Sequence, residues 1–156
     1  MLAHRFAYAA PTERSELLAI LAERGGEARL LAGGTDLLVN IRAGIAKPAL
    51  VVDVKKVRGL PFLAWSETEG LVIGPAATIN DLLQSAEVRR LFPLLAACAH
   101  DLASYQVRNR ATVIGNVVNA SPCSDMAPAL LCLEARAEIA SRRGTRSVPF
   151  REFFTG

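Results

Sequence analysis

The chain has 156 residues, of which 51% are hydrophobic and 21% charged, and its formal net charge at pH 7 is +3. A chain of this length and composition forms one globular domain, or two small lobes that share a core. The net positive charge is modest. Arg142, Arg143 and Arg146 cluster around a glycine turn, and no aromatic residue lies among them, so this cluster indicates a solvated loop rather than a nucleic-acid-binding surface. No apolar run is long enough to cross a bilayer, and the N-terminus lacks the charged-then-apolar order of a signal peptide.

The cysteines indicate a reducing compartment. Cys98, Cys123 and Cys132 are odd in number, and they form no Cys-x-x-Cys pair and have no histidine at the spacing of a metal ligand. This pattern favours free thiols over disulfides or a metal site. We therefore expect a cytoplasmic protein that contributes no metal ligands of its own.

Residues 1–54 predict a small lobe with the element order β-α-β-α-β. Pro11 and Thr12 begin its first helix, with Thr12 as the N-cap and with Glu13 and Glu16 in the first turn, where the helix dipole favours acidic groups. Gly25-Gly26 ends that helix. The predicted buried stripe of this helix is Leu17, Leu18, Ile20 and Leu21. The predicted strands are residues 5–10, 28–32 and 49–54, and the second helix is residues 37–42.

A glycine turn joins the second predicted strand to the second helix. Residues 30–32 are apolar, Gly33 and Gly34 interrupt the strand, and Thr35-Asp36 precede the helical run from Leu37. Glycine permits positive φ, and successive amides beside a helix start can form an anion-binding nest. Because Asp36 would repel a phosphate, we expect its carboxylate to cap backbone amides or to accept a ribose hydroxyl. Many such turns bind nothing, so this turn alone does not identify a site.

Residues 55–156 predict a larger lobe of mixed helix and strand. Helix 79–85 has Thr78 as its N-cap, and a helix from Pro93 to about Ser104 should bury one face. Cys98 on that face is interpreted as a core residue, and His100 as a solvated side chain. That face comprises Leu94, Leu95, Cys98 and Leu102. The other predicted elements are strands 61–66 and 71–74, a helix 126–134 capped by Ser124 or Asp125, and a hairpin of strands 135–141 and 145–148.

A second polar stretch runs from Val107 to Asp125. Hydroxyls, amides and one glycine recur there among apolar residues. The backbone amides of residues 112–116, with the Thr112 hydroxyl, are predicted to form a second anion cradle that faces the first. Asp125 is either a helix N-cap or an acceptor for a sugar hydroxyl. Two such loops in one small protein are best explained by an extended bisphosphate ligand, and neither has the G-x-G-x-x-G spacing of a Rossmann domain.

Several motifs together resemble one family. They are Ala32-Gly33-Gly34-Thr35-Asp36-Leu37, Val107-Arg108-Asn109, Ala111-Thr112-Val113-Ile114-Gly115-Asn116, Ala120-Ser121-Pro122-Cys123-Ser124-Asp125-Met126-Ala127-Pro128, Arg143-Gly144-Thr145-Arg146 and Phe153-Phe154-Thr155-Gly156. With them the chain resembles, over essentially its whole length, the FAD-binding subunit of the molybdenum hydroxylases. That family includes the flavin domains of xanthine dehydrogenase and the medium subunit of aerobic carbon monoxide dehydrogenase.

The resemblance implies an α+β, two-lobed FAD-binding fold of the PCMH/vanillyl-alcohol-oxidase type, with FAD in the groove between lobes 1–54 and 55–156. One side of the diphosphate would contact Leu30, Leu31, Ala32, Gly33, Gly34, Thr35, Asp36 and Leu37. The other side would contact Ala111, Thr112, Val113, Ile114, Gly115 and Asn116. Asp125 would bind a sugar or ribityl hydroxyl, Leu102 would line the flavin or adenine region, and Ser121 would also contact the cofactor.

The implied function is electron transfer within an FAD-dependent oxidoreductase. The family's molybdenum cofactor is on a large partner subunit and its iron–sulfur clusters are on a small one, and the flavin passes electrons to an acceptor such as NAD, quinone or oxygen. The flavin carries the redox chemistry while the protein supplies position and electrostatics. The alternative is a truncated scaffold of the same fold without bound flavin. A stand-alone flavoenzyme is disfavoured because only Cys123 is placed for covalent flavin attachment.

Two departures from the family pattern shape these expectations. Ile114 stands where the family usually has a glycine, so the second cradle is expected to be looser, or Ile114 to point into the core. The chain stops at Gly156, where the family continues into a further C-terminal domain. We therefore expect the chain to be inactive alone and to retain FAD weakly or not at all when purified alone.

Overall fold

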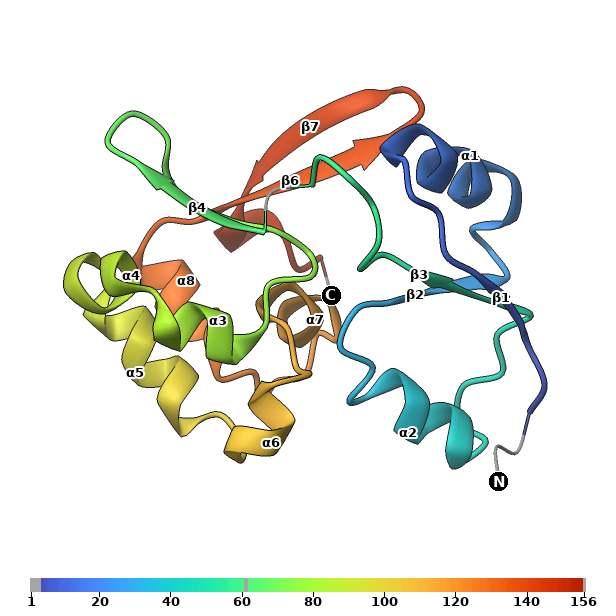
Figure 1. The fold of residues 1–156 in the computed structure, drawn as a ribbon, viewed down its shortest axis with the longest axis horizontal. Helices are drawn as coiled ribbons and strands as arrows, with labels where there is room; N and C mark the ends of the chain where they lie inside the picture. Colours follow the sequence, from blue (N-terminus) through green and yellow to red (C-terminus); the bar gives the residue numbers. More distant parts are fainter. Residues whose placement is uncertain (1–3, 61, 156) are drawn as a thin grey trace.

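The computed structural model describes residues 4–60 and 62–155 and shows two groups of elements side by side (Figure 1). We use the name small lobe for residues 4–54 and large lobe for the described residues that follow. Pro61, at which we expected a strand to begin, and Gly156, the last residue of the final family motif, lie outside the described residues.

The small lobe is built on a three-stranded parallel sheet in the order β1-β3-β2. Strands β1 (Ala7–Ala9), β2 (Ala28–Leu31) and β3 (Leu50–Asp53) alternate along the chain with helices α1 (Arg14–Arg24) and α2 (Leu37–Arg42), which confirms the predicted order. All four residues of β3 are buried. The reason is that β3 is the central strand, and the two helices lie on opposite sides of the sheet (Figure 1).

The start of α1 differs from the prediction. The helix begins two residues beyond Thr12, so its N-cap is Glu13, whose side chain makes no capping hydrogen bond. Glu16 instead accepts a hydrogen bond from the Thr12 amide at 3.1 Å. Of the predicted stripe only Leu17 is buried, and it joins the apolar cluster on β3, whereas the other three residues are half-buried. The sheet is too narrow to cover the whole helix face.

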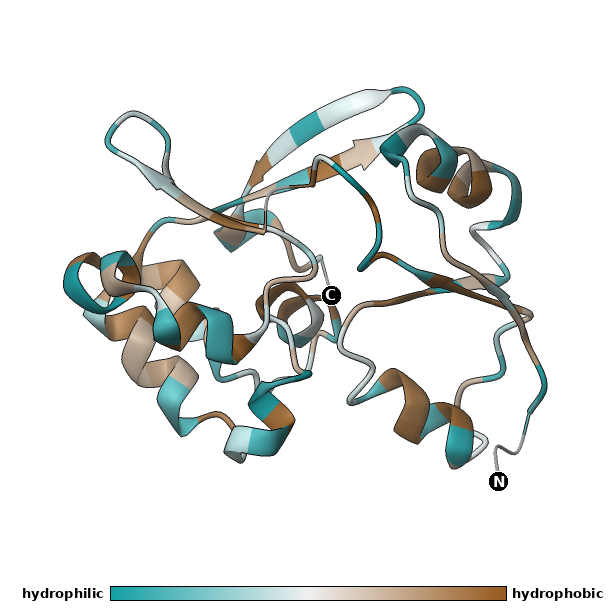
Figure 2. Cartoon of the chain, in the orientation of Figure 1, coloured by the Kyte–Doolittle hydropathy of each residue, from teal (hydrophilic) through white to brown (hydrophobic). Residues whose placement is uncertain are grey.

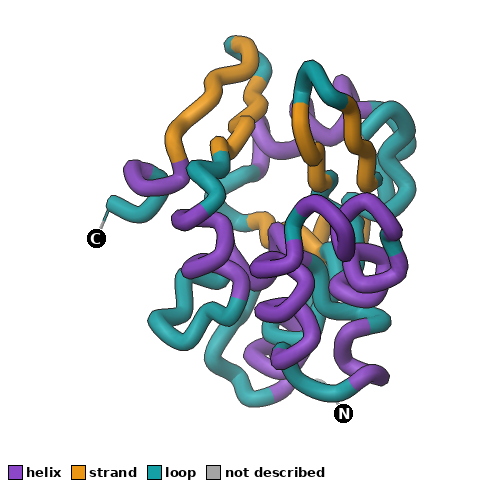
Figure 3. Tube along the Cα trace, turned by 90° about the vertical axis from the view of Figure 1, so that its left-hand side faces the viewer, coloured by secondary structure: helices purple, strands orange, loops and turns teal. Residues whose placement is uncertain are grey.

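The large lobe packs a layer of short helices beneath two antiparallel hairpins (Figure 3). Its strands are β4 (Leu63–Ser66), β5 (Gly70–Ile73), β6 (Arg136–Ser141) and β7 (Gly144–Pro149), followed by the 3-10 helix η1 (Phe150–Glu152). Its α-helices are α3 (Ile79–Gln84), α4 (Ala86–Leu91), α5 (Pro93–Asp101), α6 (Tyr105–Arg108), α7 (Val113–Val118) and α8 (Met126–Cys132). A second buried cluster, which includes Ile79, Leu82, Leu95 and Met126, holds these helices together.

Side-chain caps create three helices that we did not predict. Ser85, Ser104 and Thr112 each accept a hydrogen bond from an amide three residues later, at 3.2, 3.4 and 3.0 Å, and so begin α4, α6 and α7. The predicted cap of α3 is confirmed, because Thr78 and Asp81 form a reciprocal capping box. Short helices of this kind depend on their caps because few residues contribute to their apolar face.

The helix that we predicted from Pro93 to about Ser104 ends earlier, at Asp101, and a separate helix, α6, begins after Ser104. Ala103 has φ +45°, which breaks the helical path between α5 and α6. The Arg108 guanidinium reaches back to the carbonyls of His100 and Leu102 and so satisfies the end of α5. Leu95 and Leu102 are buried and Cys98 packs against the core, but Leu94 is 44% exposed, which contradicts its predicted place in the buried face. Likewise, α8 ends before Glu134, where φ is +51°.

The hairpin of β6 and β7 spans both lobes. It starts beside α8 and η1 in the large lobe, and its far end lies against α1 of the small lobe (Figure 1). There the Arg14 guanidinium donates to the Thr145 hydroxyl at 3.0 Å. Hydrophilic residues occupy this far end, whereas hydrophobic residues follow β3 and the helix interiors (Figure 2). Phe150 is buried, stacks with Phe153 and meets the partly exposed Phe154 edge to face, so the three rings form one aromatic cluster after β7.

Candidate functional site

The glycine turn lies at the carboxyl end of the parallel sheet, where open α/β sheets bind their ligands. It follows β2 and leads directly into α2. Gly34 has φ +79°, a conformation that side chains of L-residues rarely adopt, so the glycine is required at this position. The predicted strand, turn and helix start are therefore confirmed.

The amides of this turn are unusual in their lack of hydrogen bonds to the described part of the chain. Among the described residues, the amides of residues 33–37 make no hydrogen bond, and the first bonded amide is that of Leu38, which donates to the Gly34 carbonyl at 3.1 Å. Asp36 makes no side-chain cap bond, which removes one of its two predicted roles. Five successive free donors at a helix start are the arrangement that binds an anion such as a diphosphate.

The turn also contacts the second polar stretch. A Cβ atom added at Gly33 would lie 2.0 Å from the carbonyl oxygen of Arg110 and 3.1 Å from the Cα of Ala111. The two stretches that we predicted to face each other are therefore adjacent, although they are far apart in the sequence. The lack of a side chain at Gly33 permits this contact between the lobes, and its φ is not in the positive range.

The second stretch is a helix start rather than the loop that we expected. Thr112 is buried, and its hydroxyl accepts from the Gly115 amide at 3.0 Å, so it caps α7. The amides of Val113 and Asn116 donate to the carbonyls of Ala77 and Thr112. Within the described part of the chain, the Ile114 amide is the donor on α7's first turn that has no partner. The second cradle is thus narrower than predicted.

Asn116 and Ser124 fix the loop before α8. The Asn116 Oδ1 accepts from the Ser124 hydroxyl at 2.6 Å and from the Met126 amide at 3.3 Å. Ser124 in turn accepts from the Ala127 amide at 3.2 Å, so of the two predicted caps it is Ser124 that bonds the helix. Asp125 is exposed and makes no cap bond. Its carboxylate therefore remains available to a ligand.

The other predicted site residues differ in accessibility. Leu30 is 49% exposed, Leu31 and Leu37 are half-buried, and Leu102 is buried in the core of the large lobe beside Ala111 and Val113. Ile114 is half-buried and lies outside the buried cluster. Ser121 accepts from the Cys123 amide at 3.2 Å and so stabilises the turn before Asp125.

Sequence reasoning missed a charged group beside the glycine turn. Asp53 ends β3, is buried, and accepts from the Tyr8 hydroxyl at 2.7 Å and from the Lys55 amide at 2.9 Å. The Lys55 ammonium lies 2.8 Å from the same carboxylate and 3.1 Å from the Ala32 carbonyl. A lone carboxylate directly after a run of buried valines was the signal available in the sequence.

The bonds to Asp53 govern its ionisation. Burial by itself raises the pKa of the Asp53 carboxyl, but hydrogen bonds from the Lys55 ammonium, the Lys55 amide and the Tyr8 hydroxyl together hold that pKa below its usual value. The same hydrogen bond to Asp53 raises the pKa of Tyr8, which keeps its proton. Asp53 is therefore an ionised group in the folded protein near neutral pH.

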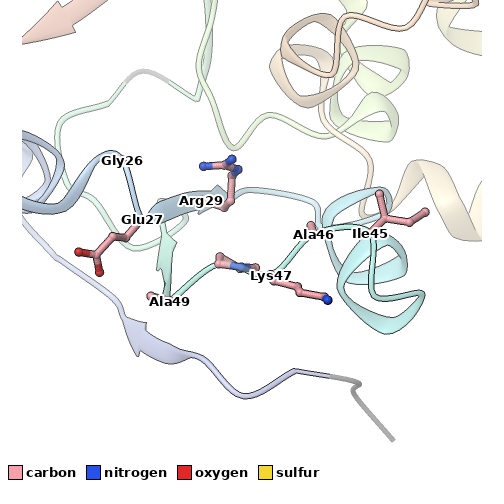
Figure 4. Close-up of a pocket in the computed structure, with 8 residues that line it drawn as sticks. Gly26, Glu27, Arg29, Ile45, Ala46, Lys47 and Ala49 are labelled. Carbon is pink, nitrogen blue, oxygen red and sulfur yellow. The ribbon is translucent and has the colours of Figure 1, made fainter.

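A shallow hollow lies at the other end of the sheet. It is lined by Arg29 of β2 and by residues that precede β2 and β3, including Glu27, Ile45 and Lys47, and it contains none of the predicted site residues (Figure 4). Glu27 points away from Arg29 and Lys47, so the charged groups do not converge on one point (Figure 4). The carboxyl end of the sheet, with its free amides, is the better candidate site.

Comparison with known protein families shows which family this chain belongs to. The model for the FAD binding domain in molybdopterin dehydrogenase matches residues 4–156. The chain belongs to this family. Membership confirms the resemblance drawn from the motifs, and the cofactor of the family is FAD.

Relatives of this FAD-binding domain are subunits of larger enzymes. It is 36% identical to the carbon monoxide dehydrogenase medium chain of Hydrogenophaga pseudoflava over 158 residues, which cover 100% of the domain and 54% of the relative. It is 37% identical to the xanthine dehydrogenase FAD-binding subunit of Escherichia coli O157:H7 over 130 residues, which cover 83% of the domain and 44% of the relative. The chain thus spans about half the length of these relatives.

A solved structure confirms the fold. The FAD-binding domain superposes with a TM-score of 0.94, at 35% identity, on a chain of carbon monoxide dehydrogenase from Hydrogenophaga pseudoflava that lacks the Mo-pyranopterin moiety of the molybdenum cofactor. The match covers 100% of the domain and 54% of that chain. The fold is therefore the predicted α+β FAD-binding fold of the PCMH type. None of the helices in the described residues is long and apolar enough to cross a membrane.

Proposed function

We propose that this FAD-binding domain holds the diphosphate of FAD on the amides of residues 33–37 and carries electrons within a molybdenum-containing dehydrogenase. The observation on which the proposal rests is the run of free amides at the carboxyl end of the sheet, beside Gly34 in its positive-φ conformation. A diphosphate supplies the anionic oxygens that such donors lack.

Other residues extend the proposed site. The free amide of Ile114 adds a donor from the large lobe, since Gly33 lies against the chain that leads into α7. The carboxylates of Asp36 and Asp125, which make no cap bonds, are assigned to sugar or ribityl hydroxyls. When bound, FAD supplies the redox chemistry, and the protein supplies donors, orientation and exclusion of water.

The proposed partners follow from the names of the relatives. Because those relatives are a medium chain and an FAD-binding subunit of dehydrogenases, we propose that this domain assembles with a molybdenum-cofactor subunit and an iron–sulfur subunit. Electrons would pass from the iron–sulfur clusters to the flavin and on to NAD, quinone or oxygen, and the domain would have no activity by itself. The thiols of Cys98, Cys123 and Cys132 are free, which supports a reducing compartment such as the cytoplasm.

Titration with FAD and with ADP tests this assignment. In a ¹⁵N-labelled sample we expect both ligands to shift the amide resonances of residues 33–37 most, because both contain the diphosphate, whereas riboflavin should shift them little. Gly44 and Gly70, which lie in other turns with positive φ, are the internal controls. Saturable binding with shifts centred on the hollow around Lys47 would contradict the assignment, and no binding of FAD at any concentration would favour the flavin-free scaffold.

A further inference from the structure

The carboxylate at the end of β3 links β1 to the segment just beyond β3, beside the glycine turn. Asp53 has a side chain that is 7% exposed, and its two oxygens are shared between Tyr8 on β1 and Lys55 just beyond β3. Tyr8 lies on the neighbouring strand β1 and Lys55 lies two residues beyond Asp53, so the carboxylate is bonded both across the sheet and along its own segment. A buried carboxylate with this number of donors is a rigid anchor.

Lys55 extends from this anchor to the glycine turn. The last ladder bond between the strands is from the Val54 amide to the Leu31 carbonyl, at 3.1 Å. Beyond it, the Ala32 carbonyl has left the sheet, and the Lys55 ammonium donates to it at 3.1 Å. The lysine therefore continues the connection between β2 and β3 for one more residue, and it does so at the residue directly before Gly33.

We infer that Lys55 is a positioning residue for the diphosphate-binding turn, and that Asp53 and Tyr8 hold Lys55 in place. This inference rests on the proposed function of the turn. The ammonium is neutralised by Asp53, so its effect comes from geometry rather than from long-range attraction of the phosphates. A turn that is held in its binding conformation loses less entropy when the ligand binds.

Three variants of the full chain separate position from charge. Lys55→Met removes the ammonium and keeps the length of the side chain, and we expect it to weaken FAD binding roughly tenfold, the usual scale for losing a hydrogen bond to a charged group. Lys56→Met removes the same charge from the adjacent exposed residue and should change the affinity by less than about twofold. Lys55→Arg keeps both contacts available and should recover much of the affinity. Titration calorimetry with FAD, ADP and riboflavin measures the three affinities.

The choice of ligands distinguishes positioning from general stabilisation. If Lys55 acts on the diphosphate-binding turn, Lys55→Met weakens the binding of FAD and of ADP by similar factors and leaves the affinity for riboflavin nearly unchanged. Equal losses for all three ligands would mean that the variant merely destabilises the fold and would overturn the inference. Tyr8→Phe removes one hydroxyl from an exposed ring, and it gives a smaller loss of the same kind if Lys55→Met fails to fold.

Backbone dynamics without ligand provide an independent reading. ¹⁵N relaxation should show lower order parameters at Gly33 and Gly34 in Lys55→Met than in wild type and Lys56→Met. If wild type binds no FAD, the proposed function of the turn fails, and unchanged order parameters would refute the positioning role as well. If FAD binds and both the affinity and the order parameters are unaffected by Lys55→Met, the positioning role alone is refuted.

Discussion

Gly33 and Gly34 are adjacent, yet each position requires glycine for a different physical reason. Gly34 has a positive φ, and a Cβ there would also lie 2.7 Å from Leu31 Cδ1. Gly33 has no such backbone constraint, but a Cβ there would collide with the Arg110 carbonyl in the other lobe. One glycine therefore shapes the turn, and the other lets the turn pack against the chain that leads into α7.

Gly33→Ala tests the contact between the lobes. Because the added methyl group would lie 2.0 Å from a backbone oxygen, we expect the variant to lose about 1–3 kcal/mol of unfolding free energy. Gly26→Ala is the matched control, since nothing lies within 4 Å of its added Cβ and its φ is not positive. Urea denaturation measures both, and equal stability of the two variants would show that the contact between Gly33 and Arg110 can be altered at no cost.

Asp53 makes the free energy of unfolding depend on pH in the acidic range. Its pKa is lowered in the folded state, so it contributes stability above the pKa of the unfolded chain, about 4, and this stability is lost as pH falls through the folded pKa. Asp53→Asn should therefore be less stable than wild type at pH 7, with a difference that narrows below pH 4. Glu23→Gln removes an exposed carboxylate without a described hydrogen-bond partner and should show no such narrowing. Denaturant titrations between pH 7 and pH 3 provide the measurement.

Among the elements, α7 shows how one side chain determines a helix start. Thr112 is buried, its hydroxyl caps the Gly115 amide, and its backbone forms a bridge with Thr78, the cap of α3. The two helices therefore begin side by side. A cap of this kind replaces an unsatisfied amide with a bonded one, which is how a helix of only six residues is stable here.

Thr112→Val tests how much this cap contributes to the free energy of unfolding. The variant keeps the volume of the side chain but removes the acceptor, so we expect a loss of about 1–2 kcal/mol, while Thr112→Ser should keep most of the stability. Thermal and urea unfolding, followed by far-UV circular dichroism, compare the two. A valine variant as stable as the serine variant would mean that packing, not the hydroxyl, holds α7.

At the scale of the whole molecule, two apolar clusters share no residue. One lies between α1 and the sheet and includes Leu50 and Val52, and the other lies among the helices of the large lobe and includes Leu82. Contacts such as those of Gly33 with Arg110 and of Arg14 with Thr145 join the lobes. Division of the chain near residue 54 stays a prediction, and the separate clusters give a way to test it.

Matched core truncations test whether the lobes unfold independently. Leu50→Ala and Leu82→Ala should each lose about 2–5 kcal/mol, but in different lobes. Trp65, the sole tryptophan of the sequence, lies on β4 and reports on the large lobe. We expect Leu82→Ala to lower the midpoint of the Trp65 fluorescence transition, and Leu50→Ala to leave it unchanged while an earlier phase appears by circular dichroism. Coincident shifts in both variants would indicate a single cooperative unit.

Several features of this protein follow from local sequence alone. The order β-α-β-α-β, the bounds of α2 and the cap at Thr78 depend on residues within a few positions of each other, where periodicity, glycine and capping residues act directly. The glycine turn belongs to the same group, because positive φ at Gly34 is a property of one residue. The family motifs added the FAD-binding fold, which the comparisons confirm.

Only the tertiary structure decided the contacts around the candidate site, because those contacts join residues that are far apart in the sequence. Nothing near Gly33 in the sequence indicates Arg110, and nothing near Ala32 indicates that Lys55 would bond its carbonyl. The short helices α4, α6 and α7 pack within the large lobe, and caps at Ser85, Ser104 and Thr112 set where they begin. Which amides stay free for a ligand is likewise known only once every other acceptor has been placed.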